Sequence, residues 1–136
     1  NLKLGVNVAS LADLYPEMYL PQMIGHRIVI DSFSTLIIKY GIDNALKFLR
    51  LAREEMRKRG ANLMFVVYTN VHTPVEMTRI MRASDLVIEL KTDIRQSEIE
   101  RLLIVHKIRD APAPQRLLPF IITERGIEAS TTSRVV

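Results

Sequence analysis

The chain has 136 residues, 48% of them hydrophobic, which is enough to bury the core of one compact domain and excludes a disordered chain. Nineteen basic against 15 acidic residues give a formal net charge of +4, so contact with phosphates is permitted but not required. Cysteine is absent and charged residues interrupt every apolar segment, which excludes disulfides, thiol chemistry and a membrane-spanning helix; we expect a cytoplasmic protein without a membrane partner.

The first clear strand of the chain follows an opening segment with little pattern. In residues 1–27, Pro16 and Pro21 prevent a long helix, so we expect an irregular segment that crosses the domain surface. Residues 28–31 are apolar and β-branched until the final aspartate. This composition predicts a strand buried on both faces of a parallel sheet.

Two helices and a second strand are predicted next. Apolar residues recur at helical spacing over 42–56, and Gly60 is placed to end that helix in a left-handed conformation. Residues 63–68 predict a second buried strand. The sequence at 73–76 has a capping-box pattern with proline at the first helical position, so a helix should begin there and reach residue 82 or 83.

The pattern changes after this helix. A third parallel strand is predicted at 85–90, and a polar turn at 91–97. The remaining apolar segments have no helix between them, which indicates an antiparallel meander. Its strands are predicted at 99–109, 117–123 and 127–131.

These elements predict an α/β fold, in which a parallel sheet flanked by helices carries a C-terminal antiparallel β extension. No internal repeat interrupts the order of the elements. We expect a single domain with a lead-in at 1–27, a parallel part at 28–90, an antiparallel meander at 98–131 and a tail at 132–136.

Asp31 and Ser32 follow the first predicted strand and form the first candidate site. Ligands of open parallel sheets bind beyond the carboxyl ends of the strands, where an acidic side chain can hold Mg²⁺. The alternative is that both side chains satisfy backbone donors of the following turn.

Lys107 and Arg109 form a second candidate site. Residues two apart on a strand point to the same face, so two cationic groups there can close on one phosphate. Strict alternation would place Leu103 and Val105 on that face as well. The alternative is an edge strand that is protected from association by its charges.

Thr69 and Asn70 end the second predicted strand, where a hydroxyl or amide could orient water or contact a terminal phosphate. Polar residues at strand ends are also common turn formers. His26, His72 and His106 show no metal-ligand spacing, and no G-x-S-x-G sequence supports a hydrolase triad built from Ser32 or Ser34.

Basic residues gather on one face of the helix predicted at 42–56 and just beyond it. Two glutamates interrupt this face, which favours a solvated surface over a nucleic-acid groove, although nucleic-acid binding remains an alternative. The basic residues are Lys47, Arg50, Arg53, Arg57, Lys58 and Arg59.

Three segments in order resemble the latter half of KaiC-like ATPase domains of the RecA superfamily. They are RIVIDSFSTL (Arg27 to Leu36), SDLVIEL (Ser84 to Leu90) and VHKIRDAPAPQRLLPFIITERGIE (Val105 to Glu128). In that family a strand ending IDS is followed by a D-x-V-I-E-L strand, a K-x-R-G strand and a P-F-x-I-T-x-x-G-I hairpin. The resemblance implies a RecA-like sheet and an ATP-binding domain with ATP and Mg²⁺ as cofactors.

The resemblance also implies roles for single residues. Asp31 would be the Walker B carboxylate that faces Mg²⁺, and Ser32, Thr69 and Asn70 would lie beside the nucleotide. Lys107 and Arg109 would reach the terminal phosphate of ATP on a neighbouring subunit. Such a heterologous interface closes into a ring or propagates as a filament, so a homo-oligomer is expected.

Two departures from the family pattern limit these expectations. Asp110 stands where the family usually has Gly, and the phosphate loop G-x-x-x-x-G-K-S/T is absent from the 136 residues. The chain begins at Asn1 rather than Met, which suggests a fragment that holds the C-terminal part of an ATPase domain. The alternatives are an assembly or regulatory module without a phosphate loop and without ATPase activity, and a nucleic-acid-binding relative.

Overall fold

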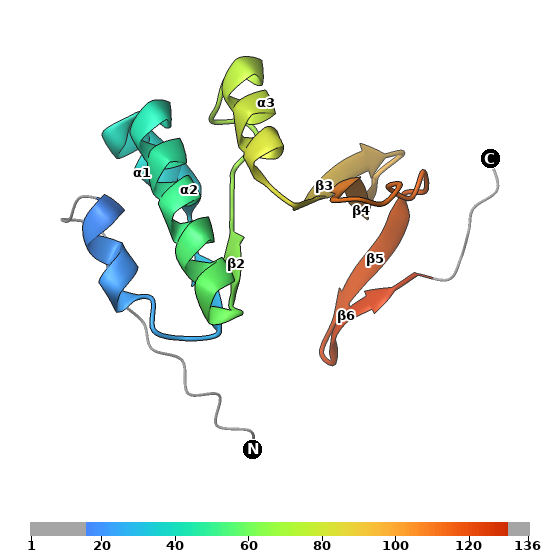
Figure 1. The fold of residues 1–136 in the computed structure, drawn as a ribbon. Helices are drawn as coiled ribbons and strands as arrows, with labels where there is room; N and C mark the ends of the chain where they lie inside the picture. The colour runs from blue at the N-terminus through green and yellow to red at the C-terminus, as the bar shows by residue number, and fades with distance from the viewer. Residues whose placement is uncertain (1–15, 131–136) are drawn as a thin grey trace. The chain divides into compact units, whose positions relative to one another are not determined.

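The computed structural model of the protein describes residues 16–130 and consists of two compact units (Figure 1). Unit 1 comprises Asn1–Ala83 and unit 2 comprises Ser84–Val136. Unit 1 contains a parallel strand pair with helices, whereas unit 2 is an antiparallel sheet. The α/β class is therefore confirmed. The predicted tail at 132–136 and the first 15 residues lie outside the described part of the chain.

Unit 1 has a strand–helix–helix–strand–helix order after a short 3₁₀ helix. Strands β1 and β2 pair in parallel, with Ile28 opposite Leu63 and Ile30 opposite Phe65. The connection between them contains the predicted helix and a shorter helix before it, which the sequence pattern had not indicated. The elements are η1 (Pro16–Gln22), β1 (Arg27–Ile30), α1 (Phe33–Tyr40), α2 (Ile42–Arg59), β2 (Asn62–Phe65) and α3 (Pro74–Ala83).

Helix α2 organises the core of unit 1, packing against η1, α1, β2 and α3. Its apolar stripe includes Ala45, Phe48 and Ala52, which have no exposed surface. Gly60 ends the helix in a left-handed conformation (φ 63°), with its N–H bonded to the last carbonyls. The predicted helix and its glycine cap are thus confirmed.

Within residues 16–83, only one face of the β1–β2 pair is covered. Ile30 is buried against the helices, whereas Val29 and Met64, on the opposite face, are 62% and 66% exposed. The sequence predicted burial on both faces. Successive residues of a strand face opposite sides, so Val29 faces away from the helices that cover Ile30.

The described part of the lead-in differs from the irregular surface segment that was expected. Residues 16–22 form η1, and Tyr19 and Met23 are buried in the core. The guanidinium of Arg59 donates a hydrogen bond to the carbonyl of Met23 at the end of this segment. The prolines do prevent a long α-helix, but they are compatible with a short 3₁₀ helix, which packs its aromatic side chain inward.

Unit 2 is a four-stranded antiparallel sheet in the order β3–β4–β5–β6. The segment at 85–90 was predicted to be a third parallel strand, and this was wrong, because it pairs antiparallel with the strand that follows it. The polar turn predicted at 91–97 was also wrong, since only Gln96 and Ser97 make the turn. The strands are β3 (Leu86–Arg95), β4 (Glu98–Ile108), β5 (Leu118–Thr123) and β6 (Gly126–Ala129).

The tight turn between β3 and β4 was not predicted, because its residue types are unusual for such a turn. Gln96 and Ser97 both have positive φ (45° and 71°), as two-residue hairpin turns of the primed type require. Such turns usually contain Asn or Gly, so Gln96 and Ser97 do not indicate one from their residue types. The hairpin between β5 and β6 has Gly126 at φ 119° and agrees with the prediction.

Large hydrophobic residues gather on one face of the unit 2 sheet. The strand register places Leu90, Leu103 and Leu118 side by side, and Ile122 opposite Ile127 on the same face. This face is largely exposed, with Leu90 at 64% and Ile127 at 71%. Within residues 84–130, Leu102 is the only hydrophobic residue that is buried, and it lies on the opposite face.

None of the described helices in the chain is long and apolar enough to cross a membrane.

Candidate functional site

The carboxyl end of β1 presents an acidic side chain to solvent. Asp31 follows the strand, is exposed, and has no hydrogen bond or ion pair among residues 16–130. Ser32 is the N-cap of α1, and its Oγ accepts from the backbone N–H of Thr35 at 3.4 Å. The peptide bond between Asp31 and Ser32 is cis. Ser32 therefore satisfies a backbone donor of the following turn, whereas the carboxylate of Asp31 has no partner among residues 16–130.

Backbone hydrogen bonds bring the segment after β2 alongside Asp31. The N–H of Val66 donates to the carbonyl of Ile30 at 3.0 Å, and the N–H of Phe33 donates to the carbonyl of Val66 at 2.9 Å. The bonded residues Ile30 and Phe33 directly precede and follow Asp31 and Ser32. Because parallel strands end at the same edge of a sheet, the residues after β1 and β2 lie along one edge.

Thr69 and Asn70 occupy the tip of a turn on this edge. The N–H of Val71 donates to the carbonyl of Tyr68 at 3.3 Å, which closes a four-residue turn with Thr69 and Asn70 at its centre. Both side chains are exposed, and the hydroxyl of Thr69 lies 3.5 Å from the amide oxygen of Asn70. Thr69 and Asn70 are thus turn formers, and the turn displays both polar groups to solvent.

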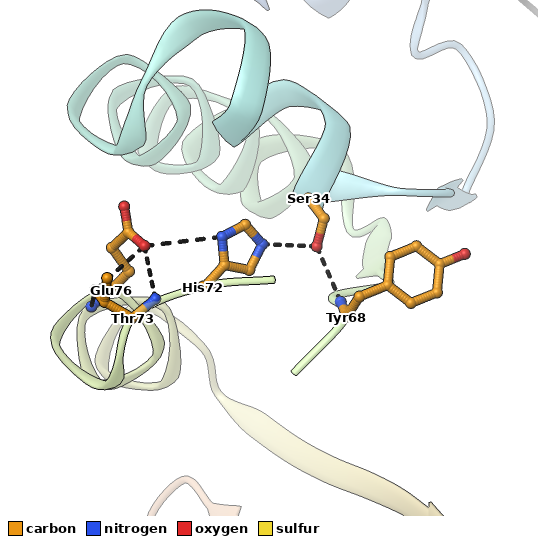
Figure 2. Close-up of polar contacts among 5 residues, drawn as sticks. All are labelled: Ser34, Tyr68, His72, Thr73 and Glu76. Carbon is orange, nitrogen blue, oxygen red and sulfur yellow. Dashed lines mark hydrogen bonds and ion pairs between the residues drawn. The ribbon is translucent and has the colours of Figure 1, made fainter. Parts of the chain in front are cut away.

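A single buried hydroxyl holds both ends of this turn (Figure 2). The Oγ of Ser34 accepts a hydrogen bond from the N–H of Tyr68 at 2.9 Å and lies 2.8 Å from Nε2 of His72. Ser34 is 1% exposed, and the side chain of His72 is 2% exposed. Ser34 was considered for a triad from sequence and His72 for a metal site, but their contact with each other was not foreseen.

Glu76 lies on the other side of the imidazole. Its Oε2 is 3.9 Å from Nδ1 of His72 and accepts hydrogen bonds from the N–H of Thr73 at 2.9 Å and from its hydroxyl at 3.2 Å. The N–H of Glu76 donates in return to the Thr73 hydroxyl, so the predicted capping box of α3 is confirmed. The capping box fixes the carboxylate that faces the imidazole.

The order Ser34, His72, Glu76 has the connectivity of a hydrolase triad, but burial argues against nucleophilic catalysis. A nucleophilic hydroxyl must reach a substrate carbonyl, whereas Ser34 is almost fully enclosed and already accepts a backbone N–H. The three residues are therefore a structural connection between the start of α1 and the start of α3.

Lys107 and Arg109 lie in unit 2, at the end of β4 that pairs with the start of β3. Lys107 is opposite Val87, and the N–H of Arg109 donates to the carbonyl of Asp85 at 2.8 Å, so the two basic residues share a face as predicted. The guanidinium of Arg109 also pairs with the carboxylate of Asp85 at 2.8 Å.

A β-bulge corrects the predicted face of the residues before Lys107. Lys107 pairs with Val87 and Val105 with Ile88, which leaves His106 as the extra residue on β4. Consecutive residues of β3 face opposite sides, so Leu103 and Val105 do not share a face with Lys107. His106 bonds to Glu89 across the strands at 2.6 Å.

Asp110 departs from the family pattern in residue type but not in backbone conformation. Its φ is 59°, in the left-handed region where glycine is favoured and where aspartate is tolerated better than most residues. The loop that follows Arg109 therefore keeps the backbone conformation that a glycine would adopt.

Across the part of the chain that the structure describes, no group of three or more His, Cys, Asp or Glu side chains could hold a metal ion. A magnesium ion held by one carboxylate and the phosphates of a nucleotide needs no such group.

Comparison with known proteins agrees with this architecture. A family model described as KaiC ATPase matches residues 11–133, and no curated protein matches the chain. Two solved structures share the fold with a TM-score of 0.67 each at 16% sequence identity. They are the flagellar accessory protein FlaH from Methanocaldococcus jannaschii and a KaiC-like protein from Pyrococcus horikoshii OT3.

The match covers 85% of this chain in both cases, but 54% of the FlaH chain and 56% of the KaiC-like protein. The chain thus spans about half the length of these structures. At this identity the structural likeness establishes the fold, whereas the family model matches most of the sequence. The chain belongs to the KaiC family of ATPase domains in the RecA superfamily.

Proposed function

We propose that the chain is the C-terminal part of an ATP-binding domain in which Asp31 serves as the Walker B carboxylate. The observation that carries the proposal is the exposed Asp31 side chain, which has no partner among the described residues and stands where two parallel strands end. Ligands of open parallel sheets bind at this edge. Ser32, Thr69 and Asn70 would face the nucleotide from the same edge.

The donor set fits a magnesium nucleotide. Magnesium is usually bound by one or two protein carboxylates together with waters and substrate phosphates, so one available aspartate suffices. When bound, the ion would neutralise charge that develops on the phosphates during hydrolysis. Asp31 would hold and orient it, and the hydroxyl of Thr69 and amide of Asn70 would orient water or a terminal phosphate oxygen.

A segment outside these 136 residues would supply the phosphate loop. The chain contains no G-x-x-x-x-G-K-S/T sequence and spans about half of the structures that share its fold. The exposed Val29 and Met64 on the uncovered face of β1 and β2 support a further part of the domain packing there. The chain alone would therefore bind ATP weakly.

Lys107 and Arg109 would act on ATP that is bound by a neighbouring copy of the protein. Their shared face lets two cations approach one phosphate. Arg109 would first leave Asp85, and the energetic cost is small because the Arg109 side chain is 54% and the Asp85 side chain 50% exposed. A head-to-tail interface of this kind produces a ring or a filament of identical subunits.

The test measures ATP hydrolysis by the full-length protein that contains this chain. We expect Asp31→Asn to lower kcat about 100-fold or more, because several kcal/mol of charge stabilisation depend on the metal. Asp43→Asn is the matched control, since Asp43 is an exposed carboxylate on α2 that pairs with Arg79. Hydrolysis by Asp31→Asn at the wild-type rate would refute the Walker B assignment.

Mixing two inactive variants tests the action in trans. In a subunit ring, Lys107→Ala retains Asp31, and Asp31→Asn retains Lys107, so some mixed interfaces contain one intact copy of each. Random 1:1 assembly should recover about a quarter of wild-type activity. If the mixture stays as inactive as its components although the subunits exchange, Lys107 does not act across an interface.

A further inference from the structure

We propose that Ser34 and His72 are positioning residues that hold the Thr69–Asn70 turn beside Asp31. The inference deepens the proposed ATP site and rests on it, because it assigns to two buried residues the placement of groups that would face the nucleotide. Neither residue would touch the nucleotide itself.

The geometry of the turn carries the inference. The Oγ of Ser34 contacts the backbone N–H of Tyr68 immediately before the turn and Nε2 of His72 shortly after it. Thr69 and Asn70 lie between these two points and are exposed. One hydroxyl thus fixes both ends of the segment and leaves its tip free to meet a ligand.

The position of Ser34 connects the turn to the acidic residue. Ser34 is three residues after Asp31 in the sequence, in the first turn of α1, and that helix start is bonded to the segment after β2 through Phe33 and Val66. A shift of the turn relative to Asp31 would therefore require the buried Ser34 contacts to break.

The hydrogen-bond roles of Ser34 and His72 are consistent with each other. Ser34 accepts from Tyr68, so its own hydroxyl proton is available to Nε2 of His72. With Nε2 as the acceptor, the ring proton of a neutral imidazole is on Nδ1, the side on which the Glu76 carboxylate lies 3.9 Å away. Thr73 holds that carboxylate. The distance between Nδ1 and Oε2 is longer than a hydrogen bond, so the hydrogen bonds of this connection are those of Ser34 with Tyr68 and His72 and that of Thr73 with Glu76.

The first measurement is backbone amide exchange in the full-length protein. We expect Ser34→Ala and His72→Phe to speed exchange at Tyr68 and Val71 about tenfold or more, since each removes one anchor of the turn. The amide of Ile30 in β1 reports whether the variant is folded and should not change. His72→Gln, whose amide can reach the same hydroxyl, should restore most of the protection.

The second measurement separates positioning from a general loss of stability. Ser34→Ala should lower kcat for ATP about tenfold and change KM less, because the groups it places would act on the terminal phosphate. In a protein that already carries Thr69→Ala and Asn70→Ala, the same substitution should have no further effect on kcat. This non-additivity is the signature of a residue that acts through the turn.

The outcomes distinguish this inference from the proposed function. Unchanged exchange at Tyr68 and Val71 in both variants would overturn the positioning role, and so would an equal loss of kcat in both backgrounds. If the wild-type protein does not hydrolyse ATP, the proposed function fails, and the exchange measurement still decides whether Ser34 and His72 hold the turn.

Discussion

Tyr19 and Phe48 pack edge to face in the core of unit 1, with ring centroids 6.2 Å apart and planes at 89°, and neither ring is exposed. The contact joins η1 to the middle of α2. A segment that precedes the first strand is therefore part of the core.

Replacing Tyr19 tests that conclusion. Tyr19→Ala should lower the free energy of unfolding by about 3–5 kcal/mol, because an enclosed aromatic ring is lost and a cavity remains. Tyr19→Phe keeps the ring and should cost about 1 kcal/mol, the value of one hydrogen bond. Denaturant unfolding measures both, and a Tyr19→Ala variant as stable as wild type would show that η1 is not needed for the core.

The ion pair between Arg109 and Asp85 allows two roles of Arg109 to be separated. Both side chains are about half exposed, so Asp85→Asn should change the free energy of unfolding by less than about 1 kcal/mol. ATP hydrolysis should fall strongly in Arg109→Gln and little in Asp85→Asn, if Arg109 acts on phosphate. Equal losses in the two variants would assign Arg109 a structural role through Asp85.

The backbone at Asp110 predicts which substitutions the loop accepts. Asp110→Gly should leave the free energy of unfolding nearly unchanged, because glycine adopts φ 59° without strain. Asp110→Val should lower it by about 1–2 kcal/mol, since a β-branched residue is disfavoured in this region. Thermal unfolding of the two variants compares them, and equal stability would contradict the left-handed conformation.

Asp93 provides a prediction on pH. The guanidinium of Arg95 donates a hydrogen bond to Asp93 at 2.9 Å and holds the pKa of that carboxyl below its ordinary value of 3.8. The associated stabilisation is present above the unfolded pKa and is lost as the pH falls through the folded pKa, that is, below pH 3.8.

Titration of the Asp93 carboxyl by NMR should give a pKa below 3.8 in the wild type. In Arg95→Gln the pKa should rise towards the ordinary value, because the charged donor is lost. A pKa that is the same in both proteins would show that Arg95 does not influence this carboxyl.

Elements that depend on local chemistry were predictable from the sequence. The stripe of α2 and its glycine cap, the capping box of Thr73 and Glu76, and the hairpin at Gly126 all have signals within a few residues. Each follows from helical spacing, a side chain that satisfies a backbone donor, or a residue that permits positive φ. Asp31 was also placed correctly after β1, whereas the second strand, predicted to reach residue 68, ends at Phe65, four residues before Thr69.

The pairing partner of β3 and the burial of Tyr19 were decided by tertiary structure. An apolar strand has the same composition whether its neighbour runs parallel or antiparallel, so the segment at 85–90 gave no indication of pairing with β4. The bulge at His106 likewise moves Lys107 to the face opposite Val105, which alternation along one strand cannot reveal.

The sequence by itself thus determined the α/β class, the principal helix and the acidic residue at the end of β1, because these follow from local periodicity and turn chemistry. Only the tertiary structure decided that Ser34 contacts Tyr68 before the Thr69–Asn70 turn and His72 after it. The physical reason is that buried polar groups must find partners, and which partner is in reach depends on how the helices pack on the strands.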